Sequence, residues 1–159
     1  MYFLKNVSNF LAFGYTNNME KDKVIQNVYK GATMAVDSIN SLLDFVDNEE
    51  MQNLLLAQQE RYYRLKSRSK QELEQMGITE LEELKVARIM ARNTMKIRMA
   101  FSRTKEKVAK MLYSGAGMGL EELAESENRL KRNGEKVPEI AKEYREMLLN
   151  NREELEKYL

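Results

Sequence analysis

The sequence predicts an all-α fold, an antiparallel four-helix bundle. Long stretches are rich in strong helix formers, and the chain has one proline and seven glycines among its 159 residues. Within these stretches, apolar residues recur every three or four positions, as they do on one face of a helix. A chain of this length corresponds to about one domain and can bury a core without disulfide bonds.

Two long helices are predicted in the first half of the chain, over about residues 24–46 and 50–76. The segment "DNEE" at 47–50 separates them, because acidic residues are favoured at a helix N-terminus. Gly77 suits the position just after a helix end. The predicted inward faces carry Val24, Ile25, Val28, Ala32, Ala35, Val36, Ile39, Leu42, Leu43 and Val46, then Met51, Leu54, Leu55, Gln58, Tyr62, Leu65, Leu73 and Met76.

A third helix is predicted from the capping sequence "TELE" at 79–82 to about Ser114. The fourth block is predicted in two parts, a piece over about 120–132 that ends at Asn133 and Gly134, and a last helix that starts at Pro138. The predicted inward residues are Val86, Met90, Asn93, Thr94, Ile97, Phe101, Val108, Met111 and Leu112, then Leu123 and Leu130, then Ile140, Tyr144, Met147, Leu148 and Leu155.

The segment "YSGAGMG" places three glycines at positions 115, 117 and 119. A phosphate-binding loop is one interpretation, but such loops follow a strand, and this segment follows a predicted helix and lacks the Lys-Ser/Thr ending. We therefore predict a helix-ending turn over 115–119 with at least one glycine at positive φ.

Residues 1–20 are predicted as an amphipathic segment separate from the bundle at 21–159. Phe3, Val7, Phe10 and Leu11 share one helical face. We expect a short helix that folds back on the bundle. Docking into a partner and lying on a membrane surface are the alternatives.

Composition excludes several kinds of site. The chain has no cysteine and no histidine, so disulfides, thiolate metal sites and Ser-His catalysis are excluded, and a cytoplasmic location is expected. Its 26 basic and 25 acidic residues nearly balance. No apolar run approaches the length of a transmembrane helix.

The segments "GATMAVDSINSLLDFV", "NEEMQNLLLAQQERYY" and "EKVAKMLYSGAGMGLEEL" resemble a group of small ferritin-like four-helix proteins of unassigned function from Gram-positive bacteria. The resemblance covers about residues 24–159. It implies a ferritin-like bundle but no particular chemistry.

A ferritin-like di-iron site needs two Glu-x-x-His motifs, which a chain without histidine cannot provide. Glu60 and Asp37 are predicted to face solvent, and the predicted third helix has no acidic residue between Glu83 and Glu106. We therefore expect no metal and no other cofactor.

Polar residues at predicted inward positions are the first candidate site. Gln58, Tyr62 and Asn93 would form either a buried polar layer between helices or the polar groups of a ligand pocket.

A basic stripe on the outer face of the predicted third helix is the second candidate site. Its residues are Lys85, Arg88, Arg92, Lys96, Arg103, Lys107 and Lys110. Residues 61–70 add five more cations, whereas the chain after Leu120 has an excess of acidic residues. Either basic and acidic faces meet within the fold or between subunits, or the stripe binds an acidic partner.

From these features we expect a non-enzymatic structural or interaction protein that self-associates or binds a protein partner. The alternative is a module that uses the stripe to bind nucleic acid or another anionic ligand.

Overall fold

The computed structural model describes residues 2–78 and 104–159, with side chains from residue 20 onward. Within these residues all regular structure is helical, so the predicted all-α class is confirmed. The helices are α1 (Tyr2–Leu43), α2 (Glu49–Gln75), α4 (Lys105–Arg132) and α5 (Glu139–Glu156).

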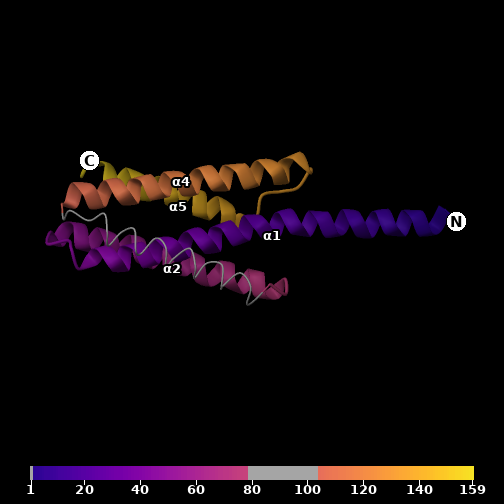
Figure 1. The fold of residues 1–159 in the computed structure, drawn as a ribbon, viewed down its shortest axis with the longest axis horizontal. Helices are drawn as coiled ribbons and strands as arrows, with labels where there is room; N and C mark the ends of the chain where they lie inside the picture. The colour runs from indigo at the N-terminus through magenta and orange to yellow at the C-terminus, as the bar shows by residue number, and fades with distance from the viewer. Residues whose placement is uncertain (1, 79–103) are drawn as a thin grey trace.

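The four helices pack as two pairs laid against each other (Figure 1). α2 returns along α1, and α5 returns along α4. α1 also packs against α4, and α2 packs against α5. The N-terminal part of α1 extends well beyond the other helices (Figure 1).

The core follows the predicted inward faces of all four described helices. Every predicted inward residue from 105 onward is at least half-buried, and the same holds for those between 24 and 76. The largest fully buried apolar side chains are Ile25, Ile39, Leu42, Met51, Leu55, Leu123, Leu130, Ile140, Leu148 and Leu155. Burying a side chain of this size stabilises the fold by roughly 1.5–3 kcal/mol each.

Three helix ends, at the start and end of α2 and at the end of α4, occur near the positions that local signals predicted. Asn48 caps α2, its side chain accepting a hydrogen bond of 2.9 Å from the Met51 amide. Gly77 after α2 and Gly134 after α4 both have positive φ, 78° and 75°. Pro138 is the residue before the first turn of α5, one position earlier than predicted.

The prediction of a turn at the glycine run is wrong. α4 continues through Gly115, Gly117 and Gly119, and among the described residues the glycines at positive φ are Gly77 and Gly134. The helix instead begins at Lys105, after Thr104, which is extended (φ −109°, ψ 147°). Residues 105–114 are helical as predicted, but the predicted helix end near Ser114 is wrong, and no break separates them from the predicted piece at 120–132.

The expectation of a separate N-terminal helix that folds back is also wrong. Residues 2–20 and the helix that follows form one continuous helix, α1, of 42 residues. No proline interrupts this stretch. Polar residues such as those at 16–18 lower helix propensity only by tenths of a kcal/mol each, so the helix continues.

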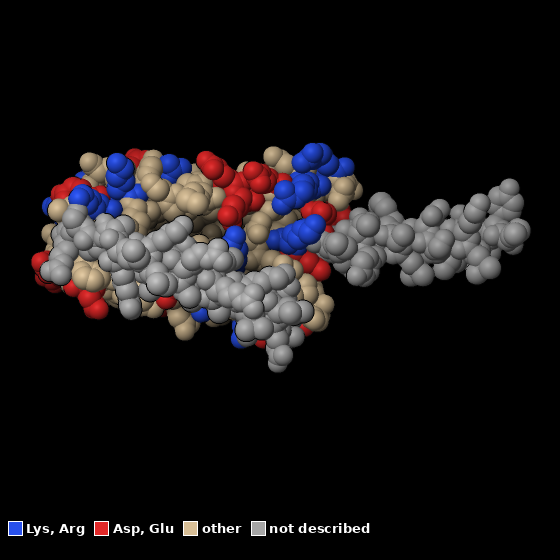
Figure 2. Space-filling model, viewed as in Figure 1, with Lys and Arg blue, Asp and Glu red and all other residues tan. Residues whose placement is uncertain are grey.

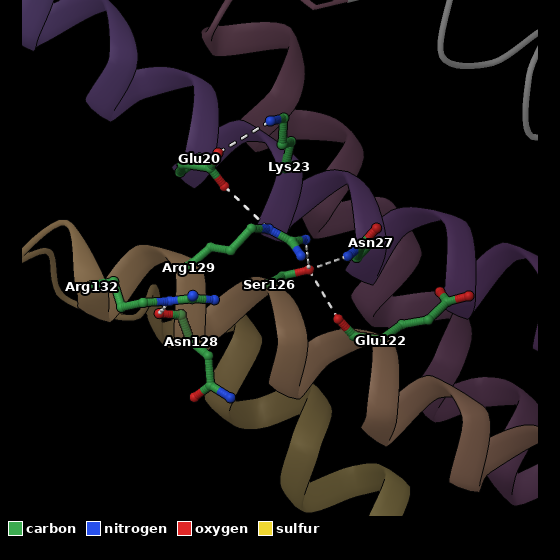
Figure 3. Close-up of polar contacts among 8 residues, drawn as sticks. All are labelled: Glu20, Lys23, Asn27, Glu122, Ser126, Asn128, Arg129 and Arg132. Carbon is green, nitrogen blue, oxygen red and sulfur yellow. Dashed lines mark hydrogen bonds and ion pairs between the residues drawn. The ribbon is translucent and has the colours of Figure 1, made fainter.

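A polar junction holds α1 against α4 near the point where α1 leaves the bundle (Figure 3). Asn27 donates a hydrogen bond to the hydroxyl of Ser126, which is fully buried and donates in turn to the Glu122 carbonyl oxygen at 2.9 Å. Arg129 Nε lies 3.5 Å from Glu20 Oε2. These contacts fix the position of α1 along α4.

Ion pairs connect α2 to α5. Arg61 Nη2 lies 2.7 Å from Glu154 Oε2, and Arg68 pairs with Glu143. Arg64 pairs with Glu60 within α2. Basic and acidic side chains are interspersed over the described part of the face in Figure 2.

None of the helices, over the residues that the structure describes, has the length and apolar character needed to cross a membrane.

Candidate functional site

A cavity of about 440 Å³ lies between the four described helices. Its lining is mainly apolar and includes residues from each helix. The described lining residues are Gly31, Met34, Ala35, Ser38, Gln58, Tyr62, Met111, Leu112, Ser114, Gly115, Ala116, Met118, Gly119, Glu122, Tyr144 and Leu148. The glycine run of α4 therefore forms part of one wall.

Glycines on α1 and α4 make room for Tyr144 of α5. A Cβ atom at Gly31 would lie 2.0 Å from the Tyr144 hydroxyl oxygen, and one at Gly119 would lie 3.2 Å from it. Any larger residue at Gly31 would therefore displace the Tyr144 ring. Side chains of α5 lie against α4 at Gly117 and Gly119, and this packing favours a helix over a turn at these positions.

Gly117 also faces α5, but a Cβ atom there would make only an ordinary van der Waals contact. The guanidinium carbon of Arg152 would lie 3.8 Å from a Cβ atom at Gly117, and it lies 4.0 Å from the centre of the Tyr113 ring. The distance to Tyr113 is that of a cation–π contact. Gly115 differs, because a Cβ atom there would meet nothing within 4 Å.

Tyr144 places a hydroxyl group in the cavity wall. The residue is 3% exposed, and no residue in the described part of the chain makes a hydrogen bond to this hydroxyl. Burial raises the pKa of Tyr144 strongly, and Tyr62 and Glu122 raise it further. The group is therefore a neutral hydrogen-bonding group at neutral pH, and a ligand could bind to it.

Gln58 and Tyr62 lie one turn apart on α2, and both are buried in the cavity wall. Gln58 Nε2 donates to the Asn151 carbonyl oxygen at 3.1 Å and to Glu154 Oε2 at 3.0 Å, so it also connects α2 to α5. Burial raises the pKa of the Tyr62 hydroxyl. Asn93, the third residue of this predicted site, lies outside the described residues.

Two residues of the predicted basic stripe are described. Lys107 and Lys110 are exposed near the start of α4. Lys85, Arg88, Arg92, Lys96 and Arg103 lie outside the described residues, so the stripe as a whole stays a prediction.

The carboxylates considered for a metal site are not brought together. Glu60 is exposed, and Asp37 is half-buried on α1. Across the residues described here, no group of three or more acidic residues could hold a metal ion.

Sequence reasoning missed most of the cavity lining. It proposed Gln58 and Tyr62 but not Tyr144 or the small residues of α1 and α4. The signal was present in the glycines at 31 and 119, since a glycine inside a helix often marks a place where a neighbour approaches closely.

Comparisons with models of protein families, with curated proteins and with solved structures found no match to this chain. Its function must therefore be inferred from its own residues.

Proposed function

We propose that this chain is a non-enzymatic binding protein that holds a small, mainly apolar molecule in the cavity between its helices. The observation that carries the proposal is a cavity of about 440 Å³ whose wall includes the buried Tyr144, a residue whose hydroxyl accepts or donates no hydrogen bond within the described part of the chain. Ligand pockets have volumes of roughly 300–1,000 Å³ and combine an apolar lining with a few polar groups.

The lining has the adaptability that a binding site needs. Met34, Met111 and Met118 have flexible, polarizable side chains that can adjust to the shape of a ligand. Gly115 leaves open space above α4. Met118 is 65% exposed, so the cavity has a route to solvent beside this residue.

The same lining offers little for catalysis. The chain has no histidine or cysteine, and Glu122 is the one carboxylate among the described lining residues. A general acid–base pair would need a second titratable group of suitable pKa. Both tyrosines of the lining have raised pKa values and keep their protons at neutral pH.

The test is binding of N-phenyl-1-naphthylamine, a neutral apolar dye whose fluorescence rises in apolar sites. We expect saturable one-to-one binding to the full chain. Gly115→Leu should fill the cavity and weaken binding at least tenfold, while Asn128→Leu, at an exposed position on the same helix and outside the lining, should not. Absence of saturable binding, or equal weakening by both substitutions, would refute the proposal.

Self-association, or binding to a protein partner, is the second candidate function, and the extension of α1 beyond the bundle favours it (Figure 1). We propose with it that the bundle is antiparallel and ferritin-like, since α2 returns along α1 and α5 along α4. Sedimentation equilibrium of the full chain tests the association. A monomer at all concentrations would contradict self-association.

Binding of nucleic acid by the basic stripe is kept as a separate alternative. Of the cations on α2, Arg61 and Arg68 already pair with carboxylates of α5. Replacing Arg92, Lys96, Arg103 and Lys110 by Ala should abolish salt-sensitive binding to DNA or RNA if the stripe has this role.

A further inference from the structure

The charge of the cavity lining restricts which molecules it can accept. Glu122 is the one charged residue among the described residues of the lining, which include no Lys or Arg. An anionic ligand would lose hydration there without gaining a cationic partner, which is strongly unfavourable. The described part of the lining therefore disfavours carboxylates, sulfates and phosphates.

Other lining residues favour positive charge. Tyr62 and Tyr144 are both buried in the wall. The face of an aromatic ring attracts organic cations, most strongly where water is excluded. The three methionine side chains of the lining are polarizable and can surround an alkyl or aryl group.

Glu122 lies where a charged head group could remain partly hydrated. Its side chain is 49% exposed, and Met118, one turn earlier on α4, is also exposed. Lys30 Nζ lies 3.5 Å from each carboxylate oxygen, which is long for a charge-assisted hydrogen bond. The carboxylate can therefore interact with a second cation. Its charge also acts inside the cavity, because Glu122 contributes to the raised pKa of Tyr144.

We propose that the cavity selects lipophilic organic cations, namely alkyl- or arylammonium compounds. The charged head would lie beside Glu122 and the nearby Tyr144, and the apolar body would extend along the rest of the lining, among the methionine side chains. This inference rests on the proposed binding function and adds to it the charge class of the ligand.

Three probes with a straight chain of eight carbon atoms, counting the carboxyl carbon of the acid, and with different head groups test the inference by calorimetric titration of the full chain. They are octyltrimethylammonium, octan-1-ol and octanoate. We expect octyltrimethylammonium to bind about tenfold more tightly than octan-1-ol, and octanoate to bind most weakly. Glu122→Gln should reduce the ratio of ammonium to alcohol affinity about tenfold.

Glu121→Gln is the matched control, because Glu121 is an exposed neighbouring carboxylate outside the lining. It should leave the ratio unchanged. Equal effects of the two substitutions would overturn the inference by showing general surface attraction. If octan-1-ol binds as tightly as the ammonium compound, the selection of organic cations is contradicted, but the binding of apolar molecules in the cavity is supported. If none of the three compounds binds, both the selection of organic cations and the proposed binding function are contradicted.

Discussion

Tyr144 and the glycines beside it form one part of the cavity wall. The ring occupies the space that side chains at Gly31 and Gly119 would fill, and its hydroxyl group lies in the cavity wall. Gly115 has no such neighbour. Gly31 is therefore needed for the packing of Tyr144, whereas Gly115 is not. Substitution of each glycine by alanine should change stability in opposite directions.

We predict opposite effects for Gly31→Ala and Gly115→Ala. The first places a methyl group 2.0 Å from the Tyr144 hydroxyl oxygen and should lower the free energy of unfolding by about 1–3 kcal/mol. The second meets nothing within 4 Å and should raise it by about 0.5–1 kcal/mol, since alanine has the higher helix propensity. Urea denaturation measures both. A loss of stability in Gly115→Ala would show that the glycine run is not helical.

The buried tyrosines predict a loss of stability at alkaline pH. The pKa values of Tyr62 and Tyr144 are raised in the folded state above the usual value of 10.0. Below that pH both states keep the phenol protons and no effect is expected. Above it the unfolded state loses protons first, so the free energy of unfolding should fall by up to about 1.4 kcal/mol per pH unit for each tyrosine.

Tyrosinate absorbance and circular dichroism recorded together measure this effect. Two of the eight tyrosines should ionise only as helical structure is lost. Tyr144→Phe should reduce the pH dependence. Ionisation of all eight in the folded protein near the usual pKa would contradict the burial of these two hydroxyl groups.

The two ends of α4 differ in how well the local sequence predicted them. Its C-terminal end, at Asn133 and Gly134, follows a local signal. Its N-terminal end, at Thr104, was not predicted, although Thr104 is a suitable N-cap and its side chain accepts a hydrogen bond of 3.3 Å from the Lys107 amide. Apolar periodicity continued through this position and hid the cap.

Thr104→Ala tests where α4 begins, because the sign of the change in the free energy of unfolding depends on whether Thr104 is an N-cap. If Thr104 caps α4, the substitution should lower the free energy of unfolding by about 0.5–2 kcal/mol. If Thr104 were inside a longer helix, alanine should instead raise it slightly, because alanine is the better helix former. Thr104→Ser, which keeps the hydroxyl group, is the control and should remain close to wild type in urea denaturation.

At the scale of the whole molecule, the described residues form a helical bundle and a long extension of one helix (Figure 1). The core begins at Val24, and the first described polar contacts of α1 with α4 begin at Glu20. The junction in Figure 3 therefore marks where α1 joins the bundle. Stability should depend on the chain from Glu20 onward.

We therefore predict that removing residues 2–19 leaves the bundle folded. The free energy of unfolding should change by less than about 1 kcal/mol. The truncation places the charged amino terminus at a new helix end, and charges at helix ends contribute about this much. Urea denaturation measures stability, and sedimentation velocity of the same variant reports whether the extension supports association. A loss of several kcal/mol would contradict the boundary at Glu20.

Much of the fold could be predicted from the sequence, because the periodicity of apolar residues reflects which helical face is buried. The inward faces around Val24, Met51 and Ile140 were predicted correctly for this reason. So were the helix ends at Gly77 and Gly134, where the residue itself favours positive φ. The sequence also excluded histidine and cysteine chemistry outright.

The cavity and the continuity of α4 were decided by tertiary structure. Glycine permits either a turn or a helix, so the run at 115–119 is ambiguous until its neighbours are known. Tyr144 and Leu148 of α5 approach the helix closely at Gly119, where a Cβ atom would lie 3.2–3.3 Å from them, and this packing favours the helix. A cavity likewise depends on what several helices together leave unfilled, and no single segment of sequence contains that information.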